Sequence, residues 1–140
     1  MFRFKQRGPL GIVLVVIALG FSAYLVFSSA QPTVYTLTGT ALKISAQFGE
    51  TIQLSEINGV TLKDTLPDNL TKVSGANLGT ILKGDFESGG TPMKVYVDTS
   101  VPPFIYLDTQ NGLVILSDQT ADKTQALYQE LLQKTAVSGG

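Results

Sequence analysis

Three aspartates, Asp98, Asp108 and Asp118, recur every ten residues, and a polar pair follows each of them. Hard cations such as Ca²⁺ are bound by several oxygen ligands, so calcium binding is the first chemistry to consider. Successive antiparallel strands reverse direction, which would place Asp98 and Asp118 at one end of a sheet and Asp108 at the other. We therefore interpret them as turn and cap residues that bond the local backbone, and we expect no metal site.

Hydroxyl nucleophiles have no activating base in this chain. The sequence contains no His and no Cys, so there is no imidazole to activate a hydroxyl and no thiol nucleophile. The hydroxyl residues considered are Thr65, Ser74, Ser100 and Ser117. We expect no catalytic residue, no cofactor and a non-enzymatic protein, and the sequence does not identify a binding residue.

Two pairs of carboxylates stand close in the sequence, where they could act as a general acid and base. They are Asp64 with Asp68 and Asp85 with Glu87. Solvated strand ends account for both pairs with fewer assumptions.

An uncharged stretch from Gly8 to Leu42 follows the basic residues Arg3, Lys5 and Arg7. Within it, residues 10–30 are almost wholly apolar and long enough, as a helix, to cross a bilayer core of about 30 Å. Basic residues before the span place the N-terminus in the cytoplasm. We predict a cytoplasmic N-terminus at 1–9, a transmembrane anchor helix at 10–30 in the lipid bilayer of the cell membrane, and an extracellular domain.

A secretory signal is the alternative for this stretch. Arg3, Lys5 and Arg7 also resemble the charged region of a signal peptide, and Ser28-Ser29-Ala30 offers small residues for cleavage after Ala30. The apolar run is longer than the usual signal core of about 7 to 15 residues, which favours a retained anchor. Cleavage would give a secreted protein.

Charge beyond the apolar stretch is mildly acidic. Without Arg3, Lys5 and Arg7, seven basic residues face eleven acidic ones, a formal charge of 7 − 11 = −4. An acidic surface argues against nucleic acid as a partner.

Alternation of apolar and polar residues predicts about seven antiparallel strands in a small barrel or sandwich. Asn58-Gly59, Ser88-Gly89-Gly90 and Asn111-Gly112 are typical turn sequences. Pro102-Pro103 removes two backbone donors before an apolar strand, which favours a bend or a protected sheet edge. An edge left open for a partner's extended peptide is the alternative. The expected strands lie within 34–44, 50–54, 60–63, 78–87, 93–97, 104–107 and 113–116.

A change to three- and four-residue spacing predicts an amphipathic helix at about 120–135. Leu127, Tyr128 and Leu131 form its narrow apolar stripe, and Ser117, Asp118 and Thr120 are candidate N-caps. We place the folded domain at 31–136 and a flexible tail at 137–140.

Several segments together resemble the bacterial pleckstrin-homology-like domains of membrane proteins. They are Leu82-Lys83-Gly84-Asp85-Phe86, Lys94-Val95-Tyr96-Val97, Pro102-Pro103-Phe104-Ile105-Tyr106 and the helix around Thr124 to Leu131. The resemblance implies two packed antiparallel sheets of seven strands, capped by the C-terminal helix, and no catalytic residues. The fold class expected is therefore mostly β, with one N-terminal transmembrane helix.

Phosphoinositide-binding members of that fold carry Lys and Arg in the loop between the first two strands. Here that loop, about 45–50, has no cation and one acid, Glu50. Phosphate binding needs charge-assisted donors, so the sequence argues against this ligand.

A non-enzymatic, membrane-anchored module that binds protein or serves as an assembly element is the function that these observations favour. The alternative is a secreted or anchored carrier that holds a small hydrophobic or lipid ligand in the barrel mouth beneath the helix. Strand interiors of small barrels are usually filled by their own side chains, which weighs against the carrier.

Overall fold

A computed structural model describes residues 33–46 and 48–139 of the 140-residue chain. All described elements belong to one compact unit, 32–140. The predicted anchor at 10–30, the cytoplasmic segment at 1–9 and the cleavage position after Ala30 lie outside the described residues. Among the residues that are described, no helix is both long enough and apolar enough to cross a bilayer.

The first three strands form a small antiparallel sheet, β1 (Val34–Leu37), β2 (Ala41–Ser45) and β3 (Thr51–Gln53). Its side chains alternate between the two faces, as the sequence alternation predicts. Leu42, Ile44 and Ile52 are buried, whereas Lys43, Thr51 and Gln53 are exposed. One face of this sheet is therefore apolar and must be covered.

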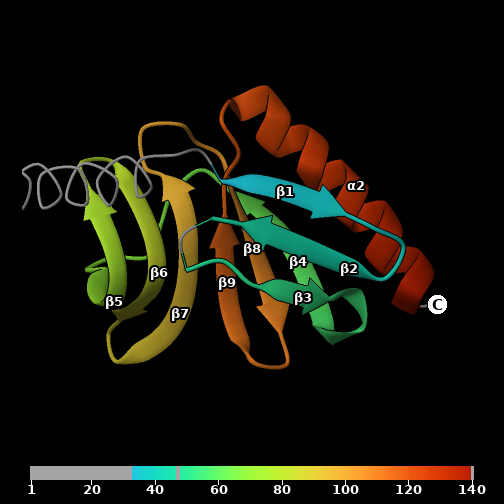
Figure 1. Ribbon diagram of the computed structural model, residues 1–140, viewed down its shortest axis with the longest axis horizontal. Helices are drawn as coiled ribbons and strands as arrows, with labels where there is room; N and C mark the ends of the chain where they lie inside the picture. Colours follow the sequence, from blue (N-terminus) through green and yellow to red (C-terminus); the bar gives the residue numbers. More distant parts are fainter. Residues whose placement is uncertain (1–32, 47, 140) are drawn as a thin grey trace, which may run out of the picture. The chain divides into compact units, whose positions relative to one another are not determined.

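Six further strands form a second sheet in the order β4-β8-β9-β7-β6-β5 (Figure 1). All neighbours pair antiparallel except β7 and β9, which run parallel. The strands are β4 (Ile57–Lys63), β5 (Thr71–Leu78), β6 (Ile81–Ser88), β7 (Thr91–Asp98), β8 (Phe104–Thr109) and β9 (Gly112–Leu116).

Two helices complete the unit, the short 3₁₀ helix η1 (Leu54–Glu56) and α2 (Ala121–Gly139). The hydroxyl of Thr120 accepts a hydrogen bond from the Lys123 amide at 3.1 Å, so Thr120 is the N-cap among the three candidates. α2 contacts β4, η1 and β8. The predicted helix is confirmed, although it ends at Gly139 and so continues past the predicted end at 135 into the segment expected to be a tail. Leu127 and Leu131 of its stripe are buried.

The small sheet and α2 cover one face of the large sheet. The side chains buried between these layers form a single group, here called the inter-sheet cluster. No residue of β5 or β6 belongs to it. Its members are Leu42, Ile44, Ile52, Leu54, Ile57, Tyr96, Ile105, Leu107, Val114, Leu116, Leu127 and Leu131. A second cluster lies on the other face and is built from β6, β7, β8 and β9, with Phe86 and Ile115 among its most buried members.

The predicted fold class is wrong. The described residues are mostly β with one C-terminal α-helix, as expected, but they form nine strands in two sheets, and one pair is parallel. The N-terminal transmembrane helix of the predicted class is not shown, since none of the described helices could cross a membrane. The parallel pair arises because the chain passes from β7 to β8 and the β8–β9 hairpin then returns β9 into the space between them. The spacing of strands along a sequence does not show which neighbour a hairpin inserts between.

Three local predictions also fail. The run 34–44 divides into β1 and β2, and strand β5 was not foreseen. Asn58-Gly59 lies inside β4 at a register shift, where it makes a bulge and not a turn. Pro102-Pro103 precedes β8, an internal strand, so the protected or open edge is wrong and the predicted bend is the interpretation that remains. The turns at Ser88-Gly89-Gly90 and Asn111-Gly112 are confirmed.

Two glycines oppose each other where β5 and β6 approach closely, Gly75 and Gly84. Both have positive φ, 144° and 118°. A Cβ on Gly84 would lie 2.6 Å from the carbonyl oxygen of Ser74 and 2.8 Å from the Cα of Gly75. These are backbone atoms, which cannot rotate away, so the hairpin requires glycine here.

Gly84→Ala should therefore lower the free energy of unfolding by about 1–3 kcal/mol, because it adds both steric overlap and an unfavourable φ. Gly59→Ala is the matched control, since its Cβ would lie 3.8 Å from the nearest atom, the Cβ of Asp108. Chemical denaturation of the two variants measures both effects. Equal stabilities would contradict the close approach of β5 and β6.

Candidate binding cleft

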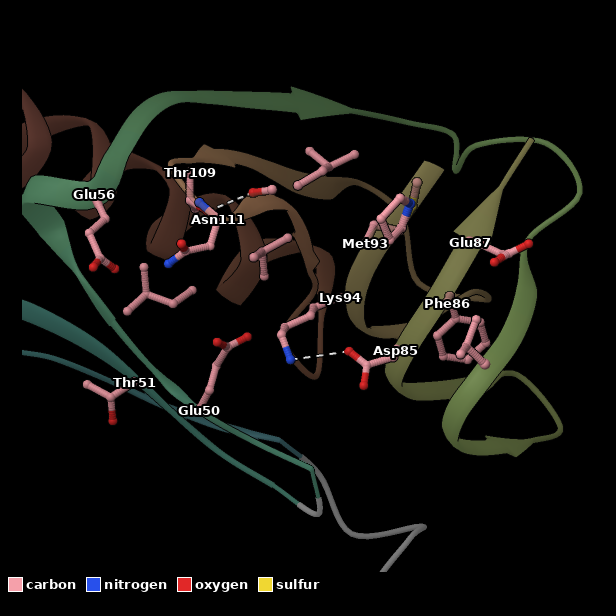
Figure 2. Close-up of a pocket in the computed structure, with 16 residues that line it drawn as sticks. Glu50, Thr51, Glu56, Asp85, Phe86, Glu87, Met93, Lys94, Thr109 and Asn111 are labelled. Atoms are coloured by element: carbon pink, nitrogen blue, oxygen red, sulfur yellow. Dashed lines mark hydrogen bonds and ion pairs between the residues drawn. The ribbon is translucent and has the colours of Figure 1, made fainter. Parts of the chain in front are cut away.

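A cleft of about 400 Å³ opens where the small sheet stops covering the large one (Figure 2). One wall is β3 with the residues that flank it, Glu50, Thr51, Ile52 and Glu56. The other wall comes from β5, β6, β7, β9 and the turn between β8 and β9, and includes Val73, Asp85, Phe86, Glu87, Pro92, Met93, Lys94, Thr109, Asn111, Gly112, Leu113 and Val114.

A single row of paired residues across the large sheet explains the position of the cleft. Asp85 on β6 pairs with Lys94 on β7, Lys94 with Val114 on β9, and Val114 with Leu107 on β8. Residues that pair across neighbouring strands share a face. The row changes from charged to apolar between β7 and β9, which marks the edge of the region covered by the inter-sheet cluster.

Charge in the cleft is predominantly negative. Four carboxylates, Glu50, Glu56, Asp85 and Glu87, line it together with one lysine, Lys94. That lysine already pairs with Asp85, with Nζ 3.2 Å from Oδ1. The lining thus has a formal charge of 1 − 4 = −3. Both partners of the pair are about half exposed, 44% and 50%, so the pair itself adds little stability.

Tyr96 fixes the loop that carries Glu50. Its side chain is fully buried in the inter-sheet cluster, and its hydroxyl donates to the carbonyl oxygen of Phe48 at 2.7 Å and to Oε2 of Glu50 at 3.4 Å. Burial raises the pKa of the Tyr96 hydroxyl, and the nearby Glu50 carboxylate raises this pKa further. The hydroxyl therefore stays protonated at neutral pH and remains a hydrogen-bond donor to the cleft wall.

The three aspartates considered for calcium lie at separate positions in the fold. Asp98 accepts hydrogen bonds from the Ser100 amide at 3.0 Å and hydroxyl at 2.6 Å, and Asp118 accepts one from the Gln119 amide at 2.7 Å. Asp108 is exposed on β8. Asp98 and Asp118 thus make the local backbone contacts expected of turn residues. Within the described part of the chain, no group of three or more metal-ligating side chains could hold an ion.

The two pairs of carboxylates singled out in the sequence lie in different parts of the fold. Asp85 and Glu87 lie on β6 and both line the cleft, so their interpretation as solvated strand ends is wrong for Asp85, which stands inside the strand. Asp64 and Asp68 are exposed in the connection between β4 and β5, outside the cleft. The two pairs are not brought together.

Sequence reasoning missed Glu50, Glu56 and Lys94 as members of a common site. Glu50 lies in the loop before β3, Glu56 in η1 and Lys94 in β7, up to 44 residues apart, and none belongs to a recognisable motif. The alternation around Glu50 and Lys94 indicates strands, but only the packing of the two sheets shows that these strands face each other. The cleft offers carboxylates and apolar surface, which suit the binding of a cationic or amphipathic group.

Searches of family models, curated proteins and solved structures found no match to this chain. The resemblance to bacterial pleckstrin-homology-like domains therefore stays a prediction.

A pH-dependent contribution to stability follows from the turn at Asp98. Burial, which by itself raises the pKa of Asp98, is outweighed by hydrogen bonds from Ser100 and Thr80, so the pKa lies below its usual value. A carboxyl group with a lowered pKa in the folded state stabilises the fold above its unfolded pKa. That contribution is lost as the pH falls through the folded pKa.

Ser100→Ala should therefore lower the free energy of unfolding at pH 7 by about 0.5–1 kcal/mol, through loss of one hydrogen bond to a charged acceptor. The difference from the unchanged chain should shrink below the usual pKa of 3.8, as the Asp98 carboxylate becomes protonated. Chemical denaturation at a series of pH values measures this difference in the free energy of unfolding. Ser55→Ala, at an exposed position, is the control, and a pH-independent difference would contradict the role of the carboxylate.

Proposed function

We propose that this domain is a non-enzymatic module that binds a protein partner in the cleft between its two sheets, held at a bacterial membrane by the apolar segment 10–30. The observation that carries the proposal is the cleft itself, about 400 Å³, with an acidic lining beside apolar side chains. Convergent polar groups on a partly apolar hollow are typical of binding sites. The sequence supplies no His and no Cys, so the cleft has no imidazole base and no thiol nucleophile.

Membrane tethering rests on the sequence. The apolar segment 10–30 ends three residues before β1, and Arg3, Lys5 and Arg7 precede it. So short a connection would tether the domain to the membrane. In this arrangement the domain is extracellular, and the alternative is a secreted domain released by cleavage after Ala30.

A carrier of small hydrophobic ligands is supported less well. Its expected site, beneath the C-terminal helix, is filled by the protein's own side chains: Leu131, Leu116 and Ile105 are fully buried there. A ligand would have to displace this part of the inter-sheet cluster, and burying one such side chain stabilises a fold by about 1.5–3 kcal/mol.

Site-specific photo-crosslinking in intact cells tests the binding role. A benzoylphenylalanine placed at Asn111, exposed at the cleft, should give a discrete adduct with one protein, and the same adduct should form from Thr51 on the opposite wall. The control position is Gln129, exposed on α2 and outside the cleft lining. Absence of an adduct from both cleft positions, or turnover of a substrate by the purified chain, would contradict the proposal.

Protease treatment of intact cells tests the location. We expect external protease to digest the domain while the membrane fraction holds an uncleaved chain, as measured by its mass. Protection of the domain would contradict the orientation. A soluble chain that begins at Gln31 would instead establish the secreted alternative.

A further inference from the structure

Strand β3 has a neighbour on one side only. It is the last strand of the small sheet, after β1 and β2, and it borders the cleft. An edge strand presents backbone N–H and C=O groups that can pair with another chain. The cleft therefore combines a side-chain lining with an open backbone edge.

Hydrogen bonds to β2 show which backbone groups of β3 face outward. The amide of Ile44 donates to the carbonyl of Glu50 at 2.8 Å, and the amide of Leu54 donates to the carbonyl of Thr40 at 2.9 Å. In an antiparallel pair, alternate residues point their backbone groups to opposite sides. Glu50, Ile52 and Leu54 thus face β2, whereas Thr51 and Gln53 direct their N–H and C=O groups away from it.

Side chains at the open edge leave room for a neighbour. Thr51 and Gln53 are exposed, while Ile52 points into the inter-sheet cluster. A segment paired with β3 would lie in the cleft, which Asp85, Lys94 and Asn111 of the large sheet also line. Glu50, Glu56 and Asp85 are among the carboxylates that line this space (Figure 2).

We propose that the cleft binds an extended segment of a partner protein that carries lysine or arginine at alternate positions, and that this segment adds to β3 as a fourth strand of the small sheet. This inference rests on the proposed function and specifies its partner. Strand addition is an established mode of peptide recognition, in which main-chain bonds supply affinity and side chains supply specificity.

Charge determines which class of segment fits. The lining has a formal charge of −3, and its lysine is already paired. A lysine or arginine stem can lie on the exposed apolar side chain of Val73, which lines the cleft, while its cation reaches the carboxylates. An acidic segment, an anionic lipid surface or a second copy of this acidic chain would be repelled.

The length of β3 sets the extent of pairing. Its three residues span about 10 Å, so direct main-chain pairing involves about three residues of the partner. Such a short interaction gives modest affinity and depends strongly on the charged side chains. We expect binding to weaken markedly when salt is raised from 50 to 300 mM, because exposed charges are then screened.

The test uses the full chain in neutral detergent micelles and a fluorescent ten-residue peptide of alternating lysine and threonine. Anisotropy should report binding of this peptide and none of its glutamate–threonine counterpart. Glu56→Gln should weaken binding by about three- to tenfold, as expected for one charged partner. Glu130→Gln, an exposed carboxylate on α2, is the control of equal charge change and should leave the affinity unchanged. Equal affinity for Glu56→Gln would overturn the proposal.

Backbone pairing is tested separately. A peptide with N-methyl groups on its four central residues lacks amide donors on both edges and should bind at least tenfold more weakly. Thr51→Pro removes an outward donor of β3 without removing a bond to β2, and it should have the same effect. Thermal unfolding of Thr51→Pro checks that this variant folds. If it does not fold, the methylated peptide alone tests backbone pairing.

The outcomes separate this inference from the proposed function. Unchanged affinity of the methylated peptide would overturn strand addition. Failure of every peptide to bind, together with a crosslinked adduct at Asn111, would overturn the basic segment but leave a protein-binding cleft. A dimer of the chain that Thr51→Pro abolishes would show a second copy in the cleft and also overturn the inference.

Discussion

Packing of the small sheet on the large one is the interaction on which the rest of the structure depends. Leu42, Ile44 and Ile52 from the small sheet meet Ile105, Leu107 and Leu116 from the centre of the large sheet, and each is at most 4% exposed. Burial of each such side chain contributes about 1.5–3 kcal/mol. Because three strands cannot cover six, this packing also determines where the large sheet is left open, and the cleft lies at that boundary.

Polar groups at the margins of the inter-sheet cluster hold the layers in register. The Tyr35 hydroxyl on β1 donates to the carbonyl of Ser117 at 2.8 Å and to that of Tyr96 at 3.2 Å, joining the small sheet to the ends of β7 and β9. The Thr124 hydroxyl on α2 accepts a hydrogen bond from the Asp118 amide at 2.7 Å. Among the described residues, every buried side-chain polar atom has a partner. These bonds fix how the layers stack, since an unpaired buried polar group would be costly.

The cleft differs from the core in the same physical terms. In the row of paired residues, β6 and β7 carry the charged residues Asp85 and Lys94. The next two strands, β9 and β8, carry the apolar residues Val114 and Leu107. Charged residues at these positions keep the uncovered half of the face hydrated. The same charges, together with Glu50 and Glu56 on the opposite wall, give the open half its negative character. The hydration of this exposed surface and the cationic partner that we propose for it thus rest on the same charges.

The amino-acid sequence by itself determined the β-rich class, the C-terminal helix, the hairpin turns at Gly89-Gly90 and Asn111-Gly112, and the turn-forming contacts of Asp98 and Asp118. These features depend on side-chain periodicity and on bonds between residues close in the chain. Only the tertiary structure decided that β9 lies between β8 and β7, that β5 forms an outer strand, and that Glu50, Glu56 and Lys94 share a cleft. Such features depend on which distant strands pair and how far one sheet covers another, and alternation along a strand is the same whichever neighbour it pairs with.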